Sequence, residues 1–182
     1  TRATRQLAVA ERAARRHGDN EAMVRVRLGE ARVAQLRGDA RASRRALEDA
    51  LRLVQPLNSP RLAALINVNI SDAWLHEGRA DRALSAIAQA LPVMRQHRDL
   101  SNQPVLLHNR GLARVQLGEL ARGRVDLEAA LALWRQVGAY GYMEGALREY
   151  ADALAATGDM HGALELFHRE RDLRETLARD NR

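Results

Sequence analysis

The sequence contains neither cysteine nor lysine among its 182 residues, and only 3% of its residues are aromatic. Without cysteine the chain can form no disulfide and no thiolate metal site, and either a reducing or an oxidising compartment would suit it. No stretch approaches the roughly 18 consecutive apolar residues of a membrane-spanning helix, so we expect no direct membrane insertion. No aromatic residue precedes Trp74, so the N-terminal part offers no platform on which nucleic-acid bases could stack.

Motifs for catalysis and cofactor binding are missing as well. There is no glycine-rich phosphate loop, no zinc-type spacing among the six histidines and no nucleophile motif. Asp72 and His76 lie four residues apart, so the carboxylate could orient a general base on one helix face, but an ordinary polar pair is the simpler interpretation. We therefore expect no catalytic residue, no metal site and no cofactor.

Glycines recur at an interval of 40 residues, at Gly38, Gly78, Gly118 and Gly158. Small or nearly small side chains stand five residues after and seven residues before each of these glycines, and bulky apolar side chains stand nine residues after. The three sets are Ser43, Ala83, Gly123 and Ala163; Ala31, Ser71, Gly111 and Ala151; and Leu47, Ile87, Leu127 and Phe167. A fixed period of this size predicts a stack of repeated units, in which small residues let two helices approach closely.

Each repeat is predicted to be a helix, a tight turn at the glycine and a second helix. A second set of turn positions, Gly18, Asn58, Arg98 and Gly138, has the same period, and only Arg98 departs from residues that tolerate positive φ. Residues 1–18 would be the second helix of a preceding repeat, followed by repeats over 19–58, 59–98, 99–138 and 139–182, the last with an extended exit helix. The expected fold class is an all-α solenoid of nine helices, the first of them truncated.

The repeat pattern resembles the tetratricopeptide repeat (TPR) family. The run Asn109-Arg-Gly-Leu-Ala-Arg-Val-Gln-Leu-Gly118-Glu is similar to the family's first helix and turn, and Ala83-Leu-Ser-Ala-Ile-Ala-Gln-Ala-Leu91 is similar to its second helix. The usual period is about 34 residues, so the 40-residue step resembles longer-helix variants. The usual tryptophan early in the first helix is missing, and the tyrosine position holds Ala34, Trp74, Arg114 and Leu154. The resemblance implies a right-handed superhelix that binds proteins or peptides.

The resemblance also implies which residues line the concave surface, because first helices face inward in this family. The candidate peptide-binding residues are Asn69, Asp72, His76, His108, Asn109, Gln116, Arg148 and Asp152. Asn69 and Asn109 occupy the family's frequent asparagine position, where an amide can both donate to and accept from a peptide backbone. Because the lysines of a carboxylate clamp are absent, we expect an extended peptide or internal segment as the partner. The alternative is that these residues are simply solvated.

Positive charge is concentrated near the N-terminus of this chain of net charge +6, since the first 52 residues contain 13 arginines and 7 acidic residues. A basic patch for an acidic protein, a lipid surface or nucleic acid could be formed by Arg12, Arg15, Arg16, Arg41, Arg44 and Arg45. A solvated outer helix face is the favoured alternative, because arginine serves as every basic residue here. Nucleic-acid binding is not expected beyond weak, salt-sensitive association.

The two ends of the chain differ from the repeats between them. Residues 1–16 align with residues 41–56, so the chain is expected to open inside the second helix of a repeat. Glu170 and Arg171 replace an alanine–leucine pair of the earlier repeats, which predicts a polar end face. The last helix resembles the exit helix of bacterial TPR sensor regions that precede a GGDEF diguanylate cyclase or histidine kinase domain. Leu166, Leu173 and Leu177 offer a short seam for a homodimer, although a plain capping helix is equally consistent.

Three function classes stay open on this basis. The first is a sensory or regulatory peptide-binding module of a larger bacterial signalling protein, placed in the cytoplasm or on the periplasmic side of the inner membrane. The second is a free-standing adaptor, and the third is the ligand-sensing region of a transcriptional regulator.

Overall fold

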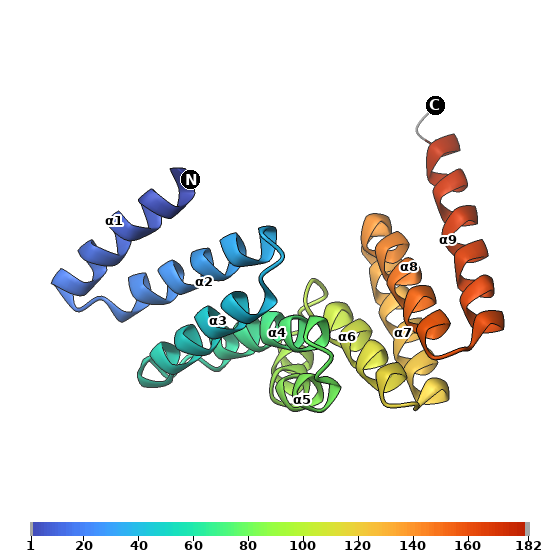
Figure 1. Ribbon diagram of the computed structural model, residues 1–182, viewed down its shortest axis with the longest axis horizontal. Coiled ribbons are helices and arrows are strands. Elements are labelled where there is room, and N and C mark those ends of the chain that lie inside the picture. The colour runs from blue at the N-terminus through green and yellow to red at the C-terminus, as the bar shows by residue number, and fades with distance from the viewer. Residues whose placement is uncertain (1, 181–182) are drawn as a thin grey trace. The chain divides into compact units, whose positions relative to one another are not determined.

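The regular elements of the protein are all helical over residues 2–180, which are the residues that the computed structural model describes. Figure 1 shows their order. The helices are α1 (Arg2–His17), α2 (Asn20–Leu36), α3 (Ala40–Val54), the short 3₁₀ turn η1 (Gln55–Leu57), α4 (Pro60–His76), α5 (Ala80–Gln96), α6 (Gln103–Gln116), α7 (Leu120–Gln136), α8 (Tyr140–Ala156) and α9 (Met160–Asp180). The predicted all-α class with nine α-helices is confirmed for this range.

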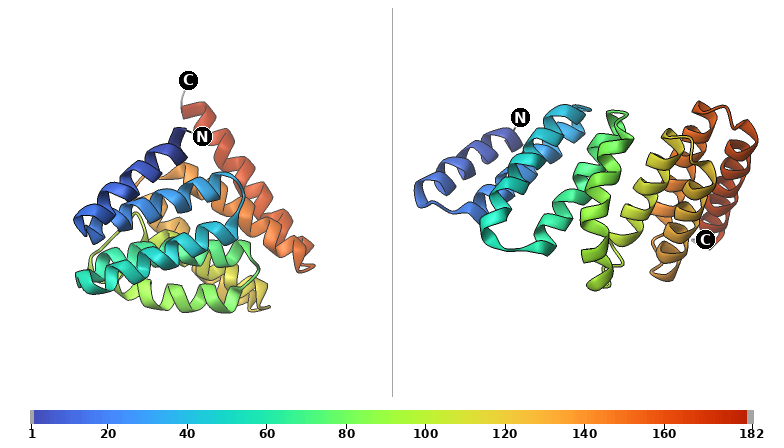
Figure 2. Two further views of the ribbon diagram at one scale, coloured as in Figure 1. Left: turned by 60° about the vertical axis from the view of Figure 1, so that its left-hand side comes forward. Right: turned by 90° about the horizontal axis from the view of Figure 1, so that it is seen from below.

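The chain forms two compact units, called here unit one (residues 1–97) and unit two (residues 98–182). Within unit one, α2 packs on α3 and α4 on α5; within unit two, α6 packs on α7 and α8 on α9. In Figure 2 the last of these hairpins, drawn in orange and red, shows the antiparallel arrangement of the pairs. The predicted repeat boundaries at residues 18, 58, 98 and 138 lie in turns between helices.

The turn inside each helix pair has one geometry, repeated four times. In the first, Gly38 has φ 73°, its N–H donates to the carbonyl of Gln35, and the N–H of Asp39 donates to that of Ala34. This is a Schellman ending, which requires a left-handed residue that glycine supplies at little cost. The same two bonds recur around Gly78, Gly118 and Gly158. The glycine periodicity therefore records where helices end.

The turns between repeats are also left-handed, including the one that departs from the sequence pattern. Asn58 has φ 47° and Arg98 has φ 49°. Arginine at positive φ is uncommon. The turn at residue 98 is therefore left-handed even though Arg98 replaces the glycine or asparagine found at the other three turns.

Aspartate side chains cap the N-termini of three helices. Asp39 accepts a hydrogen bond from the N–H of Ala42 at 2.9 Å, and Asp19 and Asp159 cap their helices in the same way. Such caps satisfy a backbone donor that the helix itself leaves unpaired. Ser59 occupies the N-cap position of α4 without a side-chain cap bond, and the helix begins at Pro60.

The small positions are buried where helices touch, as the periodicity predicts. Ala83, Ser71 and Ala151 have no exposed surface, and Ala31 is 4% exposed. The bulky positions Leu47, Ile87 and Leu127 are buried in the spaces between helices, whereas Phe167 is half-buried. The register of helix contacts is therefore confirmed.

In unit two the backbones of α6 and α7 approach each other closely at two glycines. A Cβ added to Gly123 would lie 2.9 Å from the carbonyl oxygen of Gly111 and 2.4 Å from the hydroxyl of Tyr150. A Cβ on Gly111 would lie 3.0 Å from the carbonyl oxygen of Gly123. Two glycines facing each other thus let the backbones meet, with the Tyr150 ring laid over the contact.

Tyr150 fills this place without satisfying its own hydroxyl. The residue is fully buried, and its Oη has no hydrogen-bond partner among the described residues. Burial also raises the pKa of the phenol well above its usual value, with Asp126 adding to the shift. The ring therefore contributes by packing over the two glycines, whereas burying the unpaired hydroxyl costs free energy of folding.

Substituting Tyr150 with phenylalanine is expected to preserve or raise stability by up to about 1 kcal/mol, because an unpaired buried hydroxyl is costly and the ring stays in place. Urea unfolding of parent and variant measures the difference. A loss greater than about 1 kcal/mol would show that the hydroxyl has a stabilising partner.

A buried carboxylate joins α6 to α7 beside the glycine contact. Asp126 is 2% exposed and accepts from the guanidinium of Arg110 at 2.5 and 2.9 Å and from that of Arg114 at 2.6 Å. Both arginines keep about a quarter of their side-chain surface exposed. Arg114, which stands where the TPR pattern has a tyrosine, binds this carboxylate with its guanidinium.

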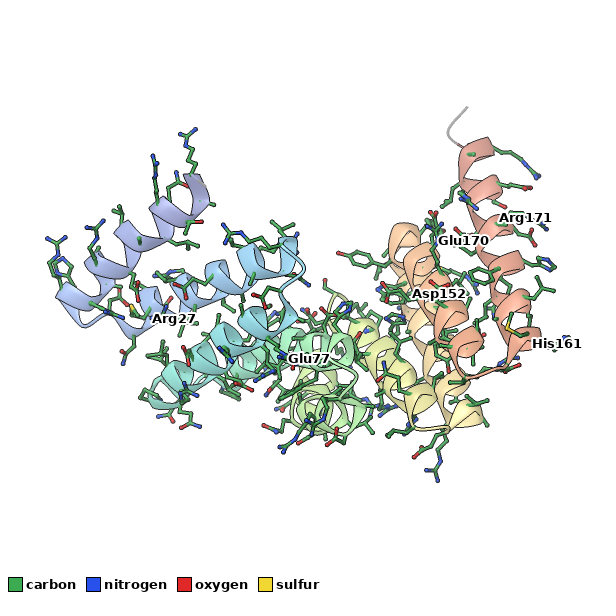
Figure 3. All side chains as sticks on the ribbon, in the orientation of Figure 1. Arg27, Glu77, Asp152, His161, Glu170 and Arg171 are labelled. Carbon is green, nitrogen blue, oxygen red and sulfur yellow. The ribbon has the colours of Figure 1, made fainter. Side chains whose placement is uncertain are left out.

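The predicted polar end face of α9 is wrong at Glu170. Glu170 is 4% exposed and binds Arg148 of α8 at 2.6 Å and Arg174 at 3.2 Å. In Figure 3 the labelled Glu170 lies on the side of α9 that faces α8, whereas Arg171 points away. The glutamate therefore belongs to the packing of unit two, where an arginine partner makes its burial tolerable.

Candidate peptide-binding surface

A trough runs along unit one between the two first helices α2 and α4, over the start of α3. It consists of two adjoining hollows of about 260 and 230 Å³ that share Gln35 and Ser43. The first is lined by Gln35, Gly38, Ala40, Ser43, Asp72, Ala73 and His76, and the second by Leu28, Ala31, Arg32, Gln35, Ser43, Leu47 and Asn69. The structure therefore brings three of the predicted residues, Asn69, Asp72 and His76, to one hollowed face.

Polar groups on the wall of the trough are linked into a chain. Arg32 donates to the amide oxygen of Gln35 at 3.2 Å, and the Gln35 amide nitrogen donates to Asp72 at 3.1 Å. His76 Nε2 lies 3.5 Å from the other oxygen of Asp72. The side chains of Arg32, Gln35 and His76 are exposed, so a ligand can exchange with these bonds. The floor is made of small and apolar groups, which suits a backbone lying close to the helices.

Asn69 is exposed and lines the second hollow, next to the linked polar side chains. Its amide nitrogen donates to the carbonyl of Leu65, one turn earlier, at 2.9 Å. This bond fixes the rotamer and leaves the amide oxygen and the second N–H directed to solvent. Asn69 therefore has the donor and acceptor expected for a peptide backbone.

In unit two, two of the predicted residues lie below the surface. His108 is 6% exposed and Asn109 is 3% exposed. Burial lowers the pKa of His108 to about 4, although bonds to Asn109 and to the backbone of Ala146 partly oppose the shift. The imidazole is neutral at pH 7 and packs beside Trp134, 5.8 Å between ring centroids. Both side chains are packed in the interior of unit two and are not exposed to a ligand on its surface.

The other predicted residues of unit two are exposed on α6 and α8. Gln116, Arg148 and Asp152 all reach solvent, and Figure 3 shows Asp152 on α8. Arg148 is engaged with Glu170, and this bond raises the pKa of its guanidinium. A ligand carboxylate would have to compete with Glu170 for Arg148.

The comparisons with known proteins bear on the fold. No protein-family model matches this chain, and no curated protein matches it. Solved structures do: TPR-like repeats of a kinesin light chain from Podosopora anserina superpose with a TM-score of 0.65 at 16% identity, over 98% of this chain and 97% of that one. A signal transduction ATPase with a tetratricopeptide repeat sensor from Pyrococcus horikoshii gives 0.72 at 15% identity, over 90% of this chain and 25% of that one.

This chain has the fold of a tetratricopeptide repeat array. A further match, aspartyl phosphate phosphatase F from Bacillus subtilis, gives a TM-score of 0.62 at 12% identity over 85% of this chain and half of that protein. Identities this low speak for the architecture alone. In a TPR array the helices α2, α4, α6 and α8 are the first helices, so the trough lies on a first-helix face.

Two of the six arginines of the predicted basic patch are ion-paired. Arg44 is half-buried and binds both Glu48 and Glu77, at 2.9 and 2.8 Å, so it is not a free cation. Arg15 binds Glu11, while the Arg12 and Arg16 side chains bond backbone carbonyls of α1. Arg41 and Arg45 are exposed, each beside a different hollow. Ion pairing therefore partly neutralises Arg15 and Arg44, whereas the carbonyl bonds leave the charges of Arg12 and Arg16 in place, and the patch stays a prediction.

Two residues of the trough are not among the eight candidate peptide-binding residues. Gln35 lines both hollows, and Arg32 lines the second. Arg32 stands six residues before Gly38, the position that Asp72 takes before Gly78, so the repeat register places it on the inward-facing surface. Gly29, nine before Gly38, would not have qualified, because its open side is filled by Leu7 of α1.

Among the described residues no cluster of three or more histidine, aspartate or glutamate side chains is arranged to hold a metal ion. Within residues 2–180, no helix is both long and apolar enough to cross a membrane.

Proposed function

We propose that this chain is a non-catalytic peptide-binding module whose trough between α2 and α4 takes an extended protein segment. The observation that carries the proposal is the linked polar wall of Arg32, Gln35 and Asp72 above a floor of small residues, with Asn69 at its end. A peptide backbone has alternating donors and acceptors, which an amide can match in both directions. The wall contains one cation and one carboxylate, which favours a ligand of mixed charge.

Asn69, Asp72 and His76 form the proposed contact surface in unit one, and Gln116, Arg148 and Asp152 form the one in unit two. His108 and Asn109 are assigned a supporting role in this proposal. Truncating Asn109 would therefore affect folding as well as binding, whereas truncating exposed Asn69 would affect binding alone.

Peptides selected from a random phage-displayed library on the intact chain provide the ligand for a test. Asn69→Ala is expected to weaken a selected peptide by about 0.5–1.5 kcal/mol, because bonds to the peptide backbone are lost while the buried core is untouched. Calorimetry measures the change. Asn20→Ala, an exposed asparagine in the first turn of α2, is the control and should leave affinity unchanged.

We further propose that this binding regulates an output domain that follows residue 182 in a larger bacterial signalling protein, a GGDEF diguanylate cyclase being the favoured output. The similarity of α9 to exit helices of such sensor regions supports this, and Leu173 and Leu177, both half-buried, would extend a seam into a dimeric linker. The coding sequence after residue 182 decides the matter. A cyclase or kinase region supports the proposal, whereas a helix-turn-helix region indicates a transcriptional regulator and an immediate stop codon an adaptor.

A further inference from the structure

A separate open hollow of about 470 Å³ lies in unit one, lined by residues of α1, α2, α3 and the turn between α2 and α3. It shares no residue with the trough. Its floor is apolar and small, formed by Leu7, Val33, Ala34, Ala42 and Ala46. Its size is within the range of about 300–1,000 Å³ that is typical of ligand pockets.

One repeat later, the equivalent place is filled by a tryptophan. Trp74 stands 40 residues after Ala34. The guanidinium carbon of Arg44 lies 4.1 Å from the Trp74 ring centroid, and that of Arg79 lies 5.8 Å away. Glu77 accepts from Arg44 at 2.8 Å and fixes it over the ring. The indole is thus held within a cluster of four side chains.

All four positions of that cluster have counterparts on the wall of the hollow. Subtracting 40 from Arg44, Trp74, Glu77 and Arg79 gives Thr4, Ala34, Arg37 and Asp39, and each of these lines the hollow. The corresponding helices are present as well, since α1, α2 and α3 take the places of α3, α4 and α5. The hollow is therefore the positional equivalent of the tryptophan site, with alanine in place of tryptophan.

Contacts that do not involve the place of the indole hold α1 on α2. Leu7 of α1 packs into the space over Gly29, where a Cβ would lie 2.5 Å from a Leu7 methyl carbon. Arg27 of α2, labelled in Figure 3, donates to Glu11 of α1 at 2.7 Å. Arg37 also reaches across to the Thr4 hydroxyl at 3.3 Å.

Charge around the hollow differs from charge around Trp74. The two arginines that flank the indole are replaced by Thr4 and Asp39. The lining includes the acids Glu11, Glu30, Asp39 and Asp49 and two cations, Arg37 and Arg45. An incoming aromatic side chain would need to bring its own cation. Glu11 and Glu30 are already paired with Arg27, which leaves Asp39 and Asp49 to meet that cation, Asp49 by exchange of its exposed pair with Arg52.

We propose that this hollow is a second binding site, which takes a tryptophan side chain flanked by arginine or lysine on a partner segment. The indole occupies the place that Trp74 has in the next repeat. The cations on its two sides lie one near Asp39 and the other near Asp49, which are about 15 Å apart along α3. The site does not depend on the trough, so each can be tested without the other.

The test uses the intact chain and two probes, the capped tripeptides Arg-Trp-Arg and Arg-Ala-Arg. NMR of the alanine methyl groups is expected to show saturable shifts at Ala42 and Ala46 with the tryptophan peptide and none with the alanine peptide. Ala34→Trp should weaken the tryptophan peptide at least tenfold and raise the melting temperature, because it fills the hollow from within. Ala156→Trp, at an exposed position of α8, is the matched control and should change neither.

Asp49→Ala gives a second reading that leaves the apolar floor intact, and it should weaken the peptide several-fold. It decides the matter if Ala34→Trp does not fold. The proposal would be overturned if the peptides shifted only residues of the trough, or if the two peptides bound equally well. It would also be overturned if Asp49→Ala, and Ala34→Trp where that variant folds, bound the tryptophan peptide as tightly as the parent.

Discussion

Gly123→Ala is expected to destabilise unit two by about 1–3 kcal/mol, although it adds a single methyl group. The new Cβ would lie 2.9 Å from the carbonyl oxygen of Gly111, which belongs to the backbone of α6 and cannot rotate away. It would also lie 2.4 Å from the Tyr150 hydroxyl. Relief therefore requires α6 and α7 to separate. Hydrogen exchange of the amides in α6 and α7, with urea unfolding, measures the loss.

Gly145→Ala is the matched control for this result. Gly145 lies inside α8, is exposed, and would bring its Cβ within 4 Å of nothing. Alanine there should stabilise the chain by about 0.5–1 kcal/mol, as expected for an exposed helix interior. Combining Gly123→Ala with Tyr150→Phe should recover part of the loss, since one of the two close contacts disappears. Equal stability of Gly123→Ala and the parent would mean that the helices do not meet at this position.

Asp126→Ala is expected to cost about 3 kcal/mol, the lower end of the range for breaking a buried ion pair. The buried carboxylate holds two guanidinium groups, and its removal leaves Arg110 and Arg114 without a counter-charge in the interface of α6 and α7. The lower end applies because both arginines retain contact with water, which screens their charge. Urea unfolding again provides the measurement.

The control for the buried network is Asp172→Ala. Asp172 pairs with Arg171 on the exposed surface of α9, where an ion pair contributes about 0–1 kcal/mol. A loss for Asp126→Ala as small as that for Asp172→Ala would show that the network contributes no more than a surface pair.

The positions that the sequence predicted well are those whose causes are local. A left-handed helix ending selects glycine at Gly38, Gly78, Gly118 and Gly158, and close helix contacts select small residues such as Ala83 and Gly111. Both requirements recur with the repeat, so a single sequence displays them four times. Arg98 keeps the left-handed turn although its residue type gives no sign of it.

The candidate site was predicted only in part, because burial depends on side chains from helices that are distant in sequence. Asn69 and Asn109 are equivalent by register, yet Asn69 is exposed and Asn109 is buried. Glu170 is polar and still lies inside unit two, because Arg148 reaches it from α8. The alignment of Ala34 with Trp74 was visible as a departure from the family pattern. Only the structure shows that the difference leaves a hollow.

The most direct test of the account is whether a bound peptide touches the trough. A photo-crosslinking amino acid in place of Arg32, which lines the trough, is compared with the same amino acid in place of Arg16 on α1, using a peptide selected on the intact chain. Peptide binding between α2 and α4 predicts efficient crosslinking from position 32, a lower yield of that crosslink in Asn69→Ala at a peptide concentration near the parent Kd, and no crosslink from position 16. Binding in the trough would be contradicted if the peptide crosslinked only from position 16, or if Asn69→Ala left the yield at position 32 unchanged.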